Sequence, residues 1–277
     1  MLFSEAELSP ATFTFLAGLV YDRSRIRLGT DKRSLVAGRL ARHLEASGCP
    51  SFDAYCDLLR RPGADEEIGT LIDLISTNHT QFFREPAHFD ILAHDLVPAL
   101  AAAAAGPLRV WSAAAASGEE PYSLAIVLAE QSRRQPGFTW QVHATDISRR
   151  LLDRCRLGIY DADKVKLPDP GLLHRYFRKG FGRREGCVRL KPDIRRHVAV
   201  EHVNLFQPNY PVPHGLDIVF CRNVMIYFDV DSRQELVGRL YDQLAPGGYL
   251  FVGHAESLLG LAHRFETTRP GVYRRPT

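Results

Sequence analysis

Two adjacent carboxylates stand where a strand is expected to give way to a helix. Within residues 109–128, apolar strand residues lead into six small residues (112–117), a turn at Gly118 and then helical spacing. Small residues let a ligand lie against the backbone, and Glu119 and Glu120 fall in the first helical turn. Two carboxylates there repel a pyrophosphate and favour a cationic ligand, or one that bears amines and hydroxyls. An ordinary strand-to-helix connection would contain the same residues without a ligand.

A third carboxylate, Asp146, ends the next predicted strand, residues 141–147. Doubly wound α/β folds use an acid at about this distance beyond a glycine-type loop to hold the hydroxyls of a ribose. The alternative is that Asp146 caps the N-terminus of the helix expected from Arg149. The sequence leaves both roles open.

Polar residues also accompany two other segments. Arg222 and Asn223 follow a predicted buried strand, and Tyr227 comes one turn later. The carboxyl ends of central strands are where open α/β sheets bind ligands. A polar string, residues 76–86, precedes the first strand. Its side chains can form hydrogen bonds in a cleft between the helical part and the residues that follow, or the segment can be a linker with a helix cap.

The elements that position these residues predict an α/β architecture. Residues 1–76 are expected to form a helical domain, and an alanine-rich helix end at residues 99–106 precedes the first strand. Residues 77–277 alternate strands and helices, as in a parallel sheet, and close with a hairpin. Residues 176–203 interrupt this alternation and predict an inserted antiparallel β-subdomain. Its alternating apolar residues are Val188, Leu190, Val198 and Val200.

Composition narrows the class of protein. The chain has 277 residues, 45% of them hydrophobic, and a net charge of +3. No apolar run approaches the ~18 residues of a membrane span, and residues 2–8 lack the basic start of a signal peptide. Five scattered cysteines without a C-x-x-C pair indicate neither a disulfide framework nor a metal site. We therefore expect a cytoplasmic protein, and the low net charge predicts no nucleic-acid partner.

Positive charge concentrates between residues 23 and 42, which hold seven basic residues and one acid, Asp31. On the helix expected after Asp31, basic residues fall on one side, and Val36, Leu40 and Leu44 fall on another. The basic side suits an acidic partner, and a solvated basic helix explains the pattern equally well. The basic residues are Arg23, Arg25, Arg27, Lys32, Arg33, Arg39 and Arg42.

With these residues assembled, the sequence resembles the CheR family, the S-adenosylmethionine-dependent methyltransferases of bacterial chemotaxis receptors. The resemblance rests on five blocks in one unbroken order that cover most of the chain. They are residues 78–85 (NHTQFFRE), 110–123 (VWSAA, then SGEEPYS), 145–147 (TDI), 220–229 (FCRNVMIYFD) and 253–257 (GHAES). Five blocks in register are far more specific than a single glycine-rich loop.

The resemblance implies a helical N-terminal domain and a Rossmann-like class I S-adenosylmethionine-dependent methyltransferase domain with a small inserted β-subdomain. It also implies S-adenosylmethionine as cofactor and S-adenosylhomocysteine as product. Ala116 and Ser117 depart from the family's commoner residues but stay small. By motif, the expected cofactor residues are Asn78, Thr80 and Arg84 on the linker side of the pocket, Glu119 at the methionine part, Asp146 at the ribose, Asn204 and Leu205 at the adenine, and Asn223 and Val224 at the rim nearest the sulfonium.

The implied activity is protein-glutamate O-methylation, which tunes chemoreceptor signalling. A glutamate acceptor has a reference pKa of about 4.3 and is already ionised at neutral pH, so that catalysis needs alignment and exclusion of water and no general base. Arg84 and Tyr227 are expected to orient the acceptor carboxylate. The alternatives are a salt bridge from Arg84 to Glu85 or Asp229, and core packing for Tyr227. Methyltransferases of bases would show prolines after the fourth strand, and residues 223–226 have none.

The resemblance also implies partners. The family docks on the acidic helical methylation region of chemoreceptors, so we expect contacts from Arg23, Arg25, Arg27, Lys32, Arg39 and Arg42. The loop 180–186 resembles family members whose β-subdomain captures a receptor C-terminal peptide by strand addition, with Arg183 and Arg184 meeting its carboxylates. The protein would then reach membrane receptor arrays only through the receptor. Two alternatives are a nucleic-acid methyltransferase acting through the basic helix, and a signalling module that senses the cofactor without turnover.

Overall fold

The computed structural model describes residues 8–76, 78–103 and 106–277, which divide into two compact units. The first takes the described residues up to 76 together with Tyr227–Ser232. The second takes Asn78–Ile226 with Arg233–Thr277. Three predicted features lie outside the described residues: the start of the chain (1–7), the domain junction at residue 77, and part of the alanine-rich helix end (104–105).

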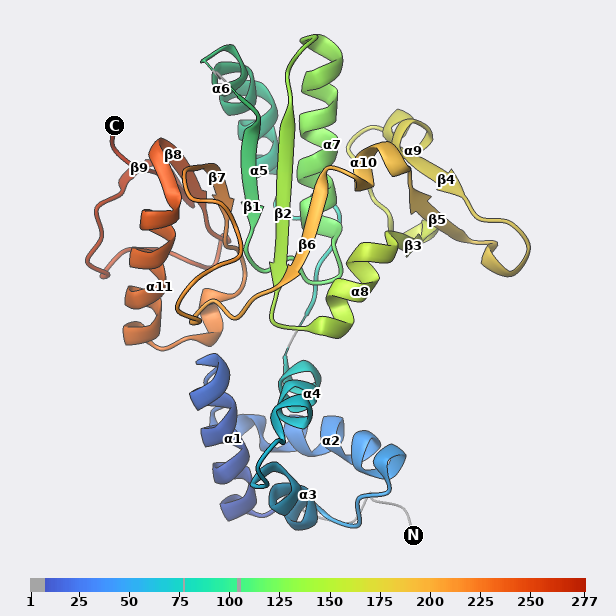
Figure 1. The fold of residues 1–277 in the computed structure, drawn as a ribbon, viewed down its shortest axis with the longest axis vertical. Helices are drawn as coiled ribbons and strands as arrows, with labels where there is room; N and C mark the ends of the chain where they lie inside the picture. Colours follow the sequence, from blue (N-terminus) through green and yellow to red (C-terminus); the bar gives the residue numbers. More distant parts are fainter. Residues whose placement is uncertain (1–7, 77, 104–105) are drawn as a thin grey trace. The chain divides into compact units, whose positions relative to one another are not determined.

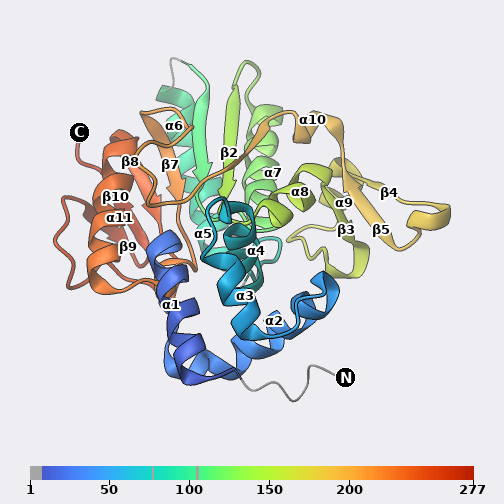
Figure 2. The same cartoon turned by 60° about the horizontal axis from the view of Figure 1, so that its bottom comes forward.

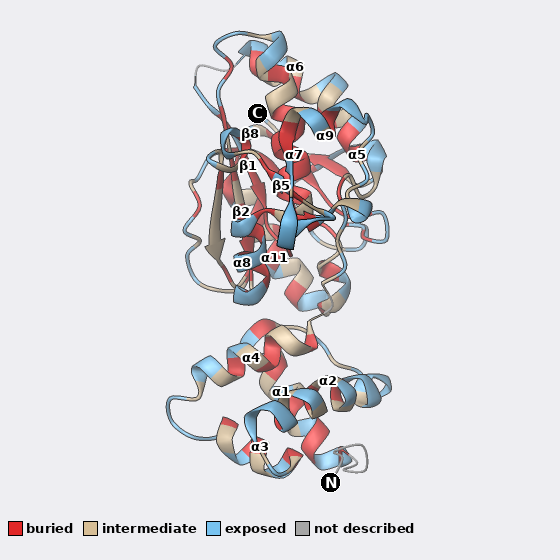
Figure 3. Cartoon of the chain, turned by 90° about the vertical axis from the view of Figure 1, so that its right-hand side faces the viewer, coloured by how far each residue is buried: buried red, intermediate tan, exposed pale blue. Residues whose placement is uncertain are grey.

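The first unit is helical (Figure 1). In α2 the predicted apolar residues Val36, Leu40 and Leu44 are fully buried, because residues four apart in the chain lie on the same side of a helix. Figure 3 shows buried segments alternating with exposed ones along these helices. The helices are α1 (Pro10–Ser24), α2 (Arg33–Ser47), α3 (Phe52–Leu59) and α4 (Asp65–Ile75), with a short turn at Thr30–Lys32.

The second unit is built on a seven-stranded sheet with the order β6-β2-β1-β7-β8-β10-β9. β1 pairs in parallel with both β2 and β7, and β10 is antiparallel to β8. The strand order therefore reverses between β1 and β7, at the point where open α/β sheets bind ligands. The strands are β1 (Leu108–Ser112), β2 (Trp140–Asp146), β6 (Val198–His202), β7 (Leu216–Phe220), β8 (Leu244–Phe251), β9 (Glu266–Arg269) and β10 (Val272–Arg274).

Helices cover this sheet, and α7 packs on β1, β2 and β6 (Figure 1). The buried residues of β1 and β7 are mostly apolar, as in most buried parallel strands. Phe220 of β7 stacks on Phe251 of β8 at 4.3 Å. No helix in the described ranges is both long enough and apolar enough to cross a membrane. The helices are α5 (Pro86–Ile91), α6 (Val97–Ala103), α7 (Glu119–Arg134), α8 (Arg149–Leu157), α9 (Gly171–Tyr176), α10 (Pro192–Arg195) and α11 (Val230–Gln243), with a π-helical turn at Leu92–Leu96 between α5 and α6.

A second, antiparallel sheet of three short strands stands at one side of this unit (Figure 2). Its order is β3-β5-β4, with β3 at Ile159–Asp161, β4 at Phe177–Lys179 and β5 at Cys187–Leu190. The bounds predicted for this subdomain, residues 176–203, were wrong at both ends, because β3 of the small sheet lies before residue 176, and Val198 and Val200 lie in β6 of the large sheet. Alternating apolar residues report that one face of a strand is buried, and they do not identify the sheet it joins.

Candidate functional site

The loop after β1 is fixed by the strands on both sides of it. Ser112 at the end of β1 lies in register with Phe220 at the end of β7. The Ala113 N–H donates to the Phe220 carbonyl at 2.8 Å, and the Ala115 N–H donates to the Thr145 carbonyl of β2 at 2.9 Å. The small residues singled out from sequence therefore lie across the carboxyl ends of three neighbouring strands.

Asp146 holds this loop from the end of β2. Its buried carboxylate accepts the Ala116 N–H at 2.8 Å and the Ser148 N–H at 2.9 Å. Ala116 has φ +47°, a conformation that non-glycine residues adopt only when their surroundings impose it. The N-cap of α8 is Ser148, whose hydroxyl accepts the Leu151 N–H, so the alternative role of Asp146 as a helix cap is wrong. Each carboxylate oxygen can accept more than one hydrogen bond, so hydroxyls of a ligand remain acceptable partners.

Gly118 allows the close approach that the loop requires. It has φ +104°, and a Cβ there would lie 2.7 Å from both the Cys155 sulfur and the Tyr160 hydroxyl. The Tyr160 hydroxyl, from β3 of the small sheet, donates to the Ser117 carbonyl at 2.8 Å. The small sheet therefore supports the loop as well as extending the unit.

The adjacent acids at the start of α7 have different surroundings. Glu119 is half-buried and accepts a hydrogen bond from the Ser117 hydroxyl at 2.7 Å, and burial raises its pKa. Glu120 is buried and accepts from the Ser112 hydroxyl and from the Arg222 Nε, both at 2.8 Å. Only Glu119 remains available to a ligand, because the Glu120 carboxylate is committed to the protein interior.

Arg222 is a buried cation that the sequence analysis placed at a strand end without a partner. Besides Glu120, its guanidinium donates to the Glu85 carboxylate at 3.1 Å and to the Arg84 carbonyl at 2.9 Å. It also lies 3.1 Å from the Nδ1 atom of His88. Burial, and then the Arg222 charge, lower the pKa of His88 to about 4, so that this imidazole is neutral at pH 7.

The polar string before α5 approaches the same region. Asn78 and Thr80 are half-buried, and the Arg84 guanidinium donates to the His79 carbonyl at 2.8 Å. The alternative of an Arg84 salt bridge to Glu85 is not what the structure shows, since Glu85 pairs with the buried arginine described above. His79 also acts electrostatically on Glu119, which lies across from this string.

Residues 203–206 continue from β6 beside the end of β2. The Val203 N–H donates to the Asp146 carbonyl at 3.0 Å, so this segment lies against the acid. The Asn204 side chain accepts the Phe206 N–H at 3.0 Å, and Leu205 is buried. The two residues expected at the adenine therefore lie near the residue expected at the ribose.

The turn after β7 carries Asn223 and Val224, both half-buried. Asn223 has φ +58°, and its side-chain amide donates to the Glu85 carboxylate at 3.1 Å. Its backbone N–H donates at 2.6 Å to Glu256, a buried acid that the sequence analysis noted only as part of a motif. Its carboxylate contacts backbone about thirty residues away along the chain, and no local pattern signals such a contact.

Tyr227 belongs to the first unit, where it is half-buried. Its carbonyl accepts the Arg27 N–H at 2.9 Å. In the same unit, the Asp229 carboxylate accepts the Tyr21 hydroxyl at 2.6 Å. The orienting role expected of Tyr227 stays a prediction.

Several of the basic residues expected to meet a receptor have partners within the first unit. Arg39 donates to the carbonyls at the C-terminus of α4, which it caps. Arg23 pairs with Asp65, and Lys32 pairs with Asp31, both at 2.9 Å and exposed to solvent. Exposed pairs exchange readily for other partners, because each contributes little to stability.

Arg183 and Arg184 are exposed in the turn Gly182–Arg184 that joins β4 to β5. Phe181 beside them is 88% exposed. β4 is an outer strand of the small sheet, so one edge of its backbone has no strand partner among the described residues. An edge of this kind can accept an added strand.

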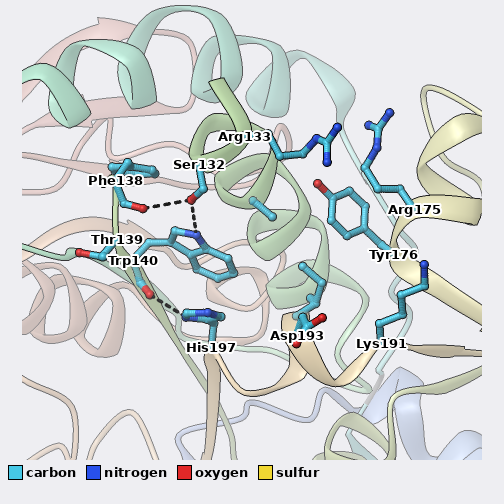
Figure 4. Close-up of a pocket in the computed structure, with 12 residues that line it drawn as sticks. Ser132, Arg133, Phe138, Thr139, Trp140, Arg175, Tyr176, Lys191, Asp193 and His197 are labelled. Atoms are coloured by element: carbon cyan, nitrogen blue, oxygen red, sulfur yellow. Dashed lines mark hydrogen bonds between the residues drawn. The ribbon is translucent and has the colours of Figure 1, made fainter. Parts of the chain in front are cut away.

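A pocket of about 410 Å³ lies at the opposite end of β2 (Figure 4). The Trp140 indole donates to the Ser132 hydroxyl at 3.0 Å, and its ring stacks on His197 at 4.4 Å. Trp140 begins β2 and Asp146 ends it, so this pocket is separate from the strand ends described above. It contains none of the residues predicted at the cofactor.

Glu85, His88 and His254 bring possible metal-ligating atoms within 4.8 Å of one another. The Arg222 guanidinium already donates to Glu85 and contacts His88. A divalent cation there would be repelled by the guanidinium, so the arrangement does not favour a metal.

Two family models match the chain. One, CheR methyltransferase, SAM binding domain, matches residues 78–273, and the other, CheR methyltransferase, all-alpha domain, matches residues 11–76. The chain is 41% identical over 266 residues to the chemotaxis protein methyltransferase of Salmonella typhimurium, covering 96% of this chain and 90% of that protein. It is also 41% identical to the Escherichia coli K12 chemotaxis protein methyltransferase, covering 96% and 91%. Identity to the protein of the same description from Borreliella burgdorferi is 33%, covering 94% and 92%.

Proposed function

The chain belongs to the CheR methyltransferase family, and we propose that its methyl acceptors are glutamate side chains of chemoreceptors. Membership makes the protein an S-adenosylmethionine-dependent methyltransferase of chemotaxis. The observation that supports a glutamate acceptor concerns the acids near the turn after β7. Glu85, Glu120 and Glu256 each accept hydrogen bonds from the protein, so none of them is poised as a general base. An ionised carboxylate needs no base, whereas an ammonium acceptor would have to lose a proton first.

The residues at the β2 end fit the cofactor. When bound, S-adenosylmethionine supplies an electrophilic methyl group on a sulfonium. We propose that Asp146 accepts hydrogen bonds from the ribose and that Glu119 binds the amine of the methionine part. Asn204 and Leu205 would bind the adenine, with Asn78 and Thr80 on the opposite side. The acids suit a cationic nucleoside, and the small loop residues leave the backbone open to it.

On the acceptor side, the chain's own groups align the reactants. We propose that Arg84 orients the incoming carboxylate, with Asn223 and Val224 at the rim, and the same role for Tyr227 stays a prediction. The Arg84 guanidinium donates one hydrogen bond to the His79 carbonyl, and its other N–H groups can donate to the carboxylate of the methyl acceptor. Since the Arg84 carbonyl is held by the buried Arg222, its backbone stays in place while the side chain binds.

Recruitment to the receptor would use two surfaces. The basic residues of the first unit suit the acidic helices that carry the methylated glutamates. They are Arg23, Arg25, Arg27, Lys32, Arg39 and Arg42. The free edge of β4, with Arg183 and Arg184 at its tip, suits an acidic C-terminal peptide of the receptor. The protein would reach membrane receptor arrays through these contacts.

Methyl transfer to a receptor fragment tests the proposal directly. The chain is incubated with labelled S-adenosylmethionine and a chemoreceptor cytoplasmic fragment, and the product is treated with alkali. We expect label that alkali releases as methanol, because carboxylate methyl esters hydrolyse in base. Replacing the labelled receptor glutamates by glutamine should abolish it. Label that survives alkali, or persists in the glutamine fragment, would contradict a glutamate acceptor.

A further inference from the structure

The turn after β7 is held by one buried carboxylate. The Glu256 Oε2 atom accepts the Asn223 N–H at 2.6 Å and the Gly253 N–H at 2.7 Å. Its Oε1 atom accepts the Met225 N–H at 2.7 Å and the Ile226 N–H at 3.3 Å. Three of the four donors belong to one tight turn, and the fourth belongs to the segment that follows β8.

This arrangement is costly for the fold. Glu256 is only 8% exposed, and burial raises its pKa while the four backbone donors act in the opposite direction. Taking a carboxylate out of water destabilises a protein unless hydrogen bonds compensate. An apolar side chain in this place would leave the N–H groups of Asn223, Met225, Ile226 and Gly253 without their acceptor, so the acid is what holds these backbone groups together.

The same turn stores backbone strain. Asn223 has φ +58°, held by Glu256 through its N–H and by Glu85 through its side-chain amide. Gly253 leaves no spare room, because a Cβ there would lie 2.5 Å from the Asn223 amide nitrogen and 2.8 Å from a Glu256 oxygen. Strained residues that their surroundings over-determine gather at functional sites.

The turn of residues 223–226 also lies where open α/β sheets bind ligands. It directly follows β7 at the reversal of strand order, next to Arg222, which fixes the Arg84 carbonyl. Ile226 within the turn is 52% exposed, so the segment reaches the surface while its backbone is held from inside. A rigid backbone at an accessible position is what the alignment of an incoming side chain requires.

We propose that Glu256 is a positioning residue for methyl transfer: by fixing the turn of residues 223–226, it holds the acceptor side of the site in reactive geometry. This inference rests on the proposed function. In this role Glu256 acts through the backbone of the turn, since its carboxylate accepts four backbone N–H groups. Its loss should therefore slow the methyl transfer step and leave the affinity for S-adenosylhomocysteine almost unchanged.

The test compares Glu256→Gln with the wild-type chain. A carboxamide keeps one acceptor oxygen and turns an NH2 group toward the remaining N–H donors, so at least one pair of hydrogen bonds is lost. We expect kcat for receptor methylation to fall at least about tenfold, with the Kd for S-adenosylhomocysteine within about threefold of wild type. Hydrogen exchange should accelerate at the backbone amides of Asn223, Met225, Ile226 and Gly253. The matched control is Glu235→Gln, which removes an exposed acid on α11 paired with Arg239.

Each outcome bears on the proposal. Equal turnover in a folded Glu256→Gln chain would overturn it, as would a cofactor Kd that rises as much as kcat falls. Should Glu256→Gln not fold, Glu256→Asp keeps the charge but is shorter by one methylene, and the same split between kcat and Kd is expected. A wild-type chain that binds S-adenosylhomocysteine but esterifies no receptor glutamate would refute the proposed function instead, and the two failures are thereby distinguished.

Discussion

The ends of β2 and β7 lie on the two sides of the loop after β1 but are stabilised in different ways. At the end of β2, a single acid, Asp146, accepts the Ala116 N–H of the loop of small residues and the Ser148 N–H at the start of α8. At the end of β7, the buried Arg222 lies between Glu85 and Glu120, and Glu256 holds the next turn. Buried charges are tolerable only while every one has its partners. The β7 end is therefore a cooperative network, and the β2 end is closer to a set of independent contacts.

The largest effect on stability is expected when the cation at the end of β7, Arg222, is removed. Arg222→Met leaves Glu85 and Glu120 without their shared partner, and we expect the free energy of unfolding to fall by about 3–5 kcal/mol. Urea unfolding followed by tryptophan fluorescence measures this, since Trp111 and Trp140 both lie in the second unit.

The matched control is Arg196→Met, which removes an exposed pair with Asp193. It should cost less than about 1 kcal/mol. Similar losses in the two variants would show that the β7 end is not a cooperative network.

At the β2 end, one substitution should weaken binding more than folding. Asp146→Ala is expected to lose about 1–3 kcal/mol of binding free energy for S-adenosylhomocysteine, in line with a charged hydrogen bond to a ribose. Calorimetry measures the difference, with Asp153→Ala, an exposed acid of α8, as control. Equal affinity in Asp146→Ala and wild type would place the ribose elsewhere.

Substitutions at Gly118 and Gly137 distinguish the cost of steric crowding from the cost of a positive φ. Gly118→Ala places a Cβ 2.7 Å from the Tyr160 hydroxyl, whereas Gly137 has a similar positive φ and open space around it. Gly118→Ala should therefore lose about 1–3 kcal/mol of stability beyond Gly137→Ala, as overpacked sites do. Equal urea midpoints would mean that the loop yields to the added methyl group.

The last prediction concerns the pH dependence of stability and rests on His88. Its pKa is about 4 in the folded chain, below its ordinary value of 6.5, so the unfolded chain binds an extra proton between those values. The stability of the wild type should thus be complete above about pH 6.5 and fall as the pH approaches 4. His88→Gln should remove that part of the pH dependence, and the exposed His94→Gln should not. Parallel stability curves for wild type and His88→Gln would contradict the assignment.

Much of the β2 end was predictable because its signals are local. The family match confirms the predicted class I fold and the cofactor. In the first unit, Val36, Leu40 and Leu44 form a buried helix face as expected, again from a local pattern. Asp146 ends its strand as expected, and its position follows from a short stretch of sequence. Periodicity and spacing suffice where an element and its neighbour in the chain determine the structure.

The β7 end was not predictable in the same way. The residue pattern did not distinguish Glu119 from Glu120, and only the family resemblance selected Glu119. Neighbouring helix residues point in different directions, and Arg222, the buried partner of Glu120, lies far along the chain. Glu256 was noted only within a motif, and its role could not be predicted, because its four partners are backbone groups, which carry no residue signature. Contacts across a hundred residues depend on the folded topology, and a single sequence does not reveal them.

The small sheet has a consequence for self-association. Its outer strand β4 ends in Arg178 and Lys179, both exposed. Two copies of the chain that met edge to edge through β4 would crowd four positive charges into one ladder of strands, and such like-charged edges repel. The strand thus discourages sheet growth between identical molecules while it remains open to a segment of opposite charge.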